Sequence, residues 1–89
     1  MDLDDWRKEI DLLDQKLLEL LNRRAGCAIE IGRIKRVIGQ PIFVPEREMS
    51  ILNRILELNN GPMDDEAARR IFQQIIDESR RLAQENQEK

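Results

Sequence analysis

One predicted helix constrains the fold more than any other feature of the sequence, because it is long for so short a chain. Residues 4–38 carry apolar side chains at alternating spacings of four and three, with no proline in the stretch. This 3.5-residue repeat indicates a continuous helix with a packing seam. Nine of the ten seam positions are apolar and the tenth is Arg24; in order they are Trp6, Ile10, Leu13, Leu17, Leu20, Arg24, Cys27, Ile31, Ile34 and Ile38.

The length of this helix indicates a second copy of the chain. A helix of about 35 residues spans about 52 Å. A compact globule of 89 residues has a radius of gyration of about 12 Å and hence a diameter of roughly 30 Å. The helix would extend beyond a monomeric globule and leave seam residues in water. We therefore expect an intertwined homodimer in which a partner chain covers the overhang.

The rest of the chain predicts two shorter helices. Gly39 and Pro41 end the first helix, and Pro45 suits the first position of the second. Acidic residues around Asp64 suit the start of the third helix. No strand-like alternation is present. We predict an all-α fold of one domain, residues 1–89, with a long, a short and a medium helix at about 4–38, 45–59 and 64–85.

Composition limits the partners and the location. The chain is 37% charged with a net charge of −3, so it has no overall basic field for nucleic acid. No apolar run approaches the roughly 18 residues that span a membrane, and we expect neither a signal peptide nor a membrane partner. Cys27 is the single cysteine. We expect it to be a buried thiol in a reducing, cytoplasmic setting.

Each predicted helix places a polar residue where its packing face is apolar. Arg24 and Lys35 lie on the face of the first helix, Glu48 on the second and Ser79 on the third. Singly, each fits a structural role: an Arg–Glu bridge, a hydroxyl bonded to its own helix, or, for Arg7 at the rim, a solvated charge. Together they hold more cations than carboxylates. Such an excess inside a bundle requires an anionic ligand, so we predict an anion-binding site.

The residue inventory narrows the chemistry of this site. The chain has no histidine, one cysteine and four glycines, and neither metal-ligand spacing nor a glycine-rich phosphate loop is present. We expect no metal and no cofactor. The remaining means of catalysis are charge placement and restraint of substrate geometry, which suit a unimolecular rearrangement of a polyanion. A helical dimerisation or regulatory module with structural charges is the non-catalytic alternative.

These residues resemble the all-helical class of chorismate mutases, which convert chorismate to prephenate on the route to Phe and Tyr. Domains of this class also occur fused to other aromatic-pathway enzymes. The resemblance covers residues 6–82. It rests on Arg7-x-x-Ile10-Asp11-x-x-Asp14, Leu17-Leu18-x-Leu20-Leu21-x-x-Arg24, Ile31-Gly32-x-x-Lys35, Pro41-x-x-x-Pro45-Glu46-Arg47-Glu48 and Ile71-Phe72-x-x-Ile75-Ile76-x-x-Ser79.

The resemblance implies roles for the charged residues. Arg24 would grip a substrate carboxylate within its own chain, and Arg7 the other carboxylate in the partner's site. Spacing independently supports this crossing, because the 17 residues between Arg7 and Arg24 correspond to about 25 Å of helix. Lys35 would donate to the ether oxygen whose bond breaks. Glu48 would accept a hydrogen bond from the ring hydroxyl.

The resemblance also assigns lesser contacts and shows two departures. Arg47 would order the site, and Ser79 would contact a carboxylate or hydroxyl. Val44 stands where the family often has Asp, and it can serve if that position contributes mainly a backbone N–H. The family usually has Gln or Glu four residues after Ser79, but this chain has Ala83.

Two questions therefore remain open at the sequence level. A regular helix turns Gln84 about 100° away from the inward face. Either the last turn distorts to bring Gln84 in, or Lys35 works alone at the ether oxygen. The alternative enzyme function is that of an isochorismate–pyruvate lyase, whose fold is similar. Glu48 favours the mutase because it offers a hydrogen-bond partner for the chorismate hydroxyl.

Overall fold

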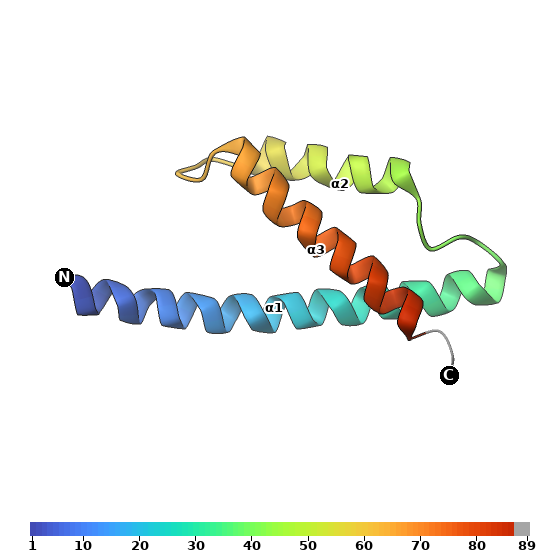
Figure 1. Ribbon diagram of the computed structural model, residues 1–89, viewed down its shortest axis with the longest axis horizontal. Coiled ribbons are helices and arrows are strands. Elements are labelled where there is room, and N and C mark those ends of the chain that lie inside the picture. Colours follow the sequence, from blue (N-terminus) through green and yellow to red (C-terminus); the bar gives the residue numbers. More distant parts are fainter. Residues whose placement is uncertain (87–89) are drawn as a thin grey trace.

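The computed structural model describes residues 1–86 and contains three α-helices (Figure 1). They are α1 (Leu3–Ile38), α2 (Pro45–Leu58) and α3 (Asp65–Glu85). Residues 1–86 contain no strand. The all-α fold with a long, a short and a medium helix is therefore confirmed, and each helix ends within one residue of its expected position.

Local chemistry at the chain's turns explains these boundaries. Asp2 caps α1 and forms a reciprocal capping box with Asp5. Pro45 occupies the first turn of α2, where its missing N–H costs no helical hydrogen bond. The Asp64 carboxylate accepts a 2.7 Å hydrogen bond from the Ala67 N–H and so caps α3.

The end of α1 depends on a left-handed residue. Gly39 has a φ of 75°, which a side chain disfavours, and its N–H donates to the Arg36 carbonyl. The following N–H, of Gln40, donates to the Lys35 carbonyl over 2.8 Å. These bonds stop α1 at Ile38 and direct the chain into the connector that leads to α2.

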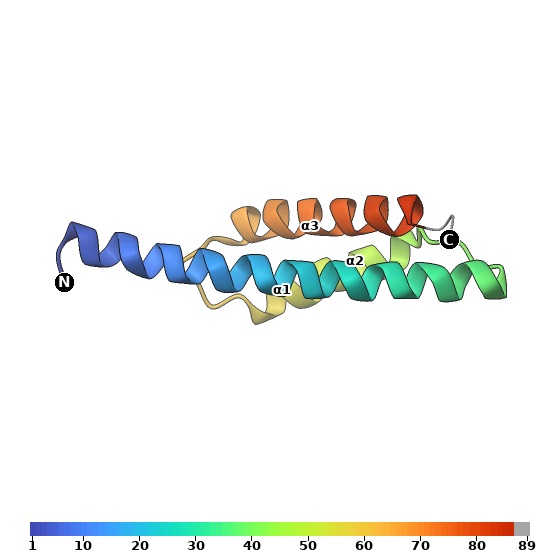
Figure 2. The same cartoon turned by 90° about the horizontal axis from the view of Figure 1, so that it is seen from below.

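Helix α3 is the element that joins the other two. It packs against both α1 and α2, and it crosses from the end of α2 to the C-terminal half of α1 (Figure 1). In the view from below, α3 lies to one side of α1, whereas α2 passes behind α1 and crosses the line of its axis (Figure 2). Three of the five residues that are buried within residues 1–86 belong to α3; the five are Gly32, Leu52, Ala68, Ile76 and Ala83.

The N-terminal half of α1 is left exposed by the rest of the described chain. Residues 1–20 are all exposed. The first five seam residues are each more than half exposed: Trp6, Ile10, Leu13, Leu17 and Leu20. The chain measures 54 × 28 × 14 Å, with a radius of gyration of 16.0 Å against about 12 Å for a compact globule. One copy therefore does not cover its own seam.

Two further observations concern the burial of Cys27 and the absence of a membrane-spanning helix within residues 1–86. Cys27 is exposed in the single chain, so the prediction that it is buried is wrong for one copy alone. Its seam neighbours Leu20 and Ile31 are also more than half exposed, whereas Arg24 is partly buried. Within residues 1–86, no helix combines the length and apolar character needed to cross a membrane.

Replacing Gly39 tests the end of α1. Because a side chain at this φ costs roughly 1–2 kcal/mol, we expect Gly39→Ala to lower the free energy of unfolding by about 1 kcal/mol. An added Cβ would meet no atom within 4 Å, so the cost lies in the backbone alone. Urea unfolding at one fixed protein concentration measures it. Gly39→Asn should lose less, because Asn tolerates this conformation; wild-type stability of Gly39→Ala would contradict the assignment.

Candidate active site

A cavity of about 530 Å³ lies among all three helices and the connector between α1 and α2. Six of the seven predicted site residues line it: Arg24, Lys35, Val44, Arg47, Glu48 and Ser79. Four isoleucines supply much of its apolar wall: Ile31, Ile42, Ile51 and Ile76. Residues that are far apart in the sequence thus meet around one space.

Arg24 and Ser79 form one polar contact between α1 and α3. The Arg24 Nη1 donates to the Ser79 Oγ over 2.8 Å in a partly buried position. The Ser79 hydroxyl therefore accepts a hydrogen bond from another helix. The structural interpretation of this residue had expected a bond within its own helix. The contact fixes the guanidinium of Arg24 at the cavity wall.

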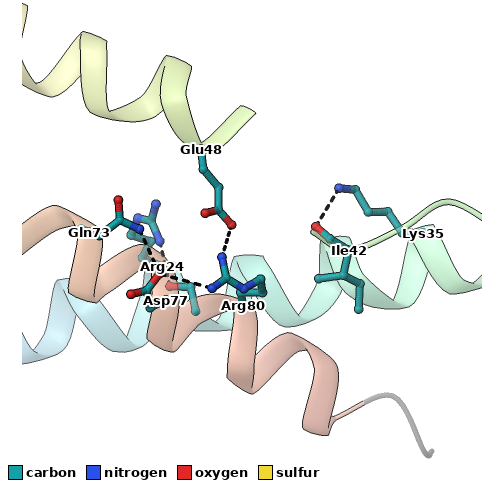
Figure 3. A network of polar contacts seen from close by, with 8 residues as sticks. Arg24, Lys35, Ile42, Glu48, Gln73, Asp77 and Arg80 are labelled. Atoms are coloured by element: carbon teal, nitrogen blue, oxygen red, sulfur yellow. Dashed lines mark hydrogen bonds and ion pairs between the residues drawn. The ribbon is translucent and has the colours of Figure 1, made fainter. Parts of the chain in front are cut away.

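Lys35 lies in another part of the cavity, beside the connector (Figure 3). Its Nζ donates a long hydrogen bond, 3.4 Å, to the Ile42 carbonyl. Lys35 is only partly exposed. A lysine amine carries three donors, so this one weak bond leaves donors for a ligand.

Glu48 makes the contact between α2 and α3. Its Oε2 accepts a 2.5 Å bond from the Arg80 Nη1 (Figure 3). The Arg80 Nη2 lies 3.3 Å from the Asp77 Oδ1, and its guanidinium lies 4.7 Å from the centre of the Phe43 ring. The pKa of Arg80 is raised, chiefly by the hydrogen bond to Glu48.

Arg80 lines the cavity but was not among the predicted site residues. The sequence did hold a signal for it. Ile76, Arg80 and Ala83 follow one another at spacings of four and three, so Arg80 is a cation on the apolar face of α3. The same signal identified Arg24 on α1.

Arg7 is the predicted site residue that the cavity of its own chain does not include. It lies near the N-terminus of α1, where that helix extends beyond α2 and α3 (Figure 1). Its side chain is 67% exposed and lies 3.9 Å from the Asp4 carboxylate. Because α1 is one continuous helix, Arg7 and Arg24 cannot reach the same ligand within one chain.

The last turn of α3 shows whether Gln84 turns inward in place of Ala83. The helix continues to Glu85, so the turn is not distorted. Ala83 is buried and lines the cavity, whereas Gln84 is exposed and does not. Gln84 is therefore not brought into the position that Ala83 occupies.

The charges around the cavity favour an anionic ligand. Four cations line it, namely Arg24, Lys35, Arg47 and Arg80, against the single carboxylate of Glu48. No cluster of three or more histidine, cysteine, aspartate or glutamate side chains suited to a metal ion is found within residues 1–86. The arrangement can therefore bind and polarise a polyanion through fixed positive charges.

Comparison with known proteins identifies the family. The family model for chorismate mutase type II matches residues 6–84. The chain therefore belongs to the chorismate mutase type II family. A structure of chorismate mutase from Thermus thermophilus is 34% identical and superposes with a TM-score of 0.90, covering 92% of this chain and 93% of the other. A chorismate mutase from Helicobacter pylori, crystallised in complex with prephenate, is 31% identical with a TM-score of 0.86, over 94% and 91% of the two chains.

A part of some longer proteins is also similar to this chain. The bifunctional chorismate mutase/prephenate dehydratase of Pseudomonas aeruginosa is 45% identical over 75 residues, which are 79% of this chain and 20% of that protein. The chain thus spans about a fifth of the length of the curated relatives that match it in this way.

The excess of cations predicts binding of a dicarboxylate. A ligand at 100 times its dissociation constant stabilises the folded state by about 2.7 kcal/mol, so a cyclic dicarboxylate analogue of the chorismate mutase transition state should raise the melting temperature. We expect Arg24→Gln to abolish most of this rise and the exposed Arg23→Gln, outside the cavity, to keep it. Thermal unfolding monitored by circular dichroism measures both. Equal shifts in the two variants would contradict this assignment of the site.

Proposed function

We propose that this chain is a cytoplasmic isomerase that converts chorismate to prephenate on the route to Phe and Tyr. The observation that carries the proposal is the meeting of Arg24, Lys35 and Glu48 around one cavity with an excess of positive charge. The prephenate complex of the Helicobacter pylori relative supports it, because that relative shares this fold at 31% identity.

The proposed mechanism uses binding and charge without a proton transfer. Arg24, held by Ser79, grips one carboxylate of chorismate and helps to restrain it in the folded diaxial form. In that form the ether C–O bond breaks as a new C–C bond forms, and negative charge develops on the ether oxygen. Lys35 donates to this oxygen and stabilises the charge. No covalent intermediate and no cofactor takes part.

Three further residues of the same chain belong to the proposed binding site. Glu48 accepts a hydrogen bond from the ring hydroxyl of chorismate. Val44 contributes its backbone N–H, which does not depend on its side chain. Arg47 supplies a positive charge at the edge of the site, where it is exposed in the single chain. The charge balance of these groups suits a dianion.

The proposed active form is an intertwined homodimer. The exposed seam of α1 supports it, because a second copy would cover the apolar side chains that one copy leaves in water. The position of Arg7 gives independent support. It lies about 25 Å along α1 from Arg24, so the second carboxylate would be gripped by Arg7 of the partner subunit.

Ala83 sets the expected strength of catalysis. Loss of one hydrogen-bond donor to a developing oxyanion costs roughly 10²–10³ in rate. Gln84 does not line the cavity and offers no replacement. Lys35 therefore stabilises the ether oxygen without a side-chain donor from position 83, and we expect a modest turnover number.

Direct conversion of chorismate tests the function. We expect the purified chain to remove chorismate absorbance, with prephenate as the product, identified by its acid conversion to phenylpyruvate. Lys35→Met, which keeps most of the length of the side chain without its charge, should be nearly inactive. A folded dimer that leaves chorismate unchanged would refute the proposal, and pyruvate release from isochorismate would assign the lyase activity instead.

Mixing two inactive variants tests the crossed site. Lys35→Ala and Arg7→Ala homodimers should both have almost no activity, because every site lacks one group. After subunit exchange at equal concentrations, half of the dimers are mixed and each has one intact site, so about a quarter of wild-type activity should return. Mixing under conditions that prevent exchange is the control. No recovery after demonstrated exchange would refute a site that takes Arg7 from the partner subunit.

A further inference from the structure

The bond between Glu48 and Arg80 lies in the cavity, and the mechanism above gives Arg80 no function. Both side chains are mostly buried, with exposed fractions of 18% for Glu48 and 28% for Arg80. We propose that Arg80 is a positioning residue that holds the Glu48 carboxylate oriented toward the substrate hydroxyl. This inference rests on the proposed mutase function and assigns a further residue to its site.

Arg80 is itself held from three sides, as a positioning group must be. Nη1 bonds to the Glu48 Oε2, and Nη2 to the Asp77 Oδ1 over 3.3 Å. The guanidinium lies 4.7 Å from the centre of the Phe43 ring. Asp77 is fixed in turn, because its Oδ1 also accepts a 2.9 Å bond from the Gln73 Nε2 (Figure 3). A planar guanidinium with these partners has one defined orientation.

The two oxygens of Glu48 have different surroundings. Oε2 is bonded to Arg80, whereas within residues 1–86 Oε1 accepts no hydrogen bond. One oxygen thus anchors the carboxylate and the other is available to a ligand in the cavity. A group that is already oriented loses less freedom when the substrate hydroxyl binds, which is how positioning contributes to rate.

The charge of Arg80 also pairs with the Glu48 carboxylate. A largely buried carboxylate is costly unless a cation pairs with it. The bond to Glu48 raises the pKa of Arg80, so the guanidinium stays charged. Arg80 already faces two carboxylates, Glu48 and Asp77, which favours a positioning role over capture of a substrate carboxylate.

A double-mutant cycle on kcat/KM tests this inference. The variants are Arg80→Met, Glu48→Ala and the double variant. A misplaced group costs on the order of 10² in rate, so we expect Arg80→Met to lower kcat/KM by about 10² in the wild-type background. In the Glu48→Ala background the same change should cost no more than about twofold. Arg80→Lys, which keeps the charge, should recover part of kcat.

Arg81→Met is the matched control. Arg81 is the next residue on α3, and its guanidinium bonds to Glu78 and Glu85 on the exposed face. We expect this variant to keep wild-type kcat/KM. If Arg80→Met does not fold, as judged by helicity, the cycle is run with Arg80→Lys and Glu48→Ala.

The outcomes separate the inference from the proposed function. Independent losses at Arg80 and Glu48, or an Arg80→Met variant as active as Arg81→Met, would overturn the positioning role while the mutase function stands. A variant that loses only thermal stability and keeps kcat/KM would also overturn it, since a merely structural contact behaves so. A wild-type chain with no mutase activity would overturn the proposed function and this inference with it.

Discussion

The geometry of the cavity depends on two adjacent residues of α3, each of which bonds to a different helix. Ser79 accepts a hydrogen bond from Arg24 on α1, and Arg80 donates one to Glu48 on α2. Helix α3 packs against both α1 and α2, and so sets the distance between them. Only a few of the described residues are buried. The position of the site therefore depends both on polar contacts between helices and on a small apolar core.

The same contacts show how fixed charge is maintained in a cavity with apolar walls. Four cations and one carboxylate leave uncompensated positive charge at the lining, and such charge opposes folding unless solvent or a ligand meets it. Arg80 is neutralised by Glu48 and Asp77, whereas Arg24 has only the Ser79 hydroxyl as its side-chain partner within residues 1–86. The groups left without a countercharge are those suited to binding an anion. Arg80 thus contributes to the contact between helices, whereas Arg24 is available to bind an anion.

The sequence predicts the helices well because their limits depend on local chemistry. Gly39, Pro45 and Asp64 act through their own backbone or neighbouring N–H groups, so their effects can be read without knowledge of the tertiary structure. Arg24 and Glu48 could be found because a charge on an apolar face is unusual on its own helix. Val44 and Arg47 were expected from the family resemblance, and six of the seven expected site residues line one cavity.

Two properties could not be predicted from the sequence, because each depends on contacts with another part of the structure. Cys27 lies on the seam as expected, but its burial requires a neighbour that the single chain does not provide. Arg80 stands beside Arg81 in a charged stretch, and most such residues are solvated. The distinguishing fact is that Glu48, 32 positions earlier, reaches Arg80 from α2. Such a pairing depends on how the helices cross, which a one-dimensional pattern does not specify.

The continuity of α1 also limits how this chain can change in length. Each residue of a helix adds about 1.5 Å of rise and about 100° of rotation. One residue inserted between Leu13 and Leu20 would turn the N-terminal part of the seam away from the face that carries Arg24 and Lys35. An insertion of about seven residues would restore the face but displace the two parts by about 10 Å. In α1 a change in length therefore also changes the direction of the side chains. Deletions or insertions are tolerated far better in the connector than within α1.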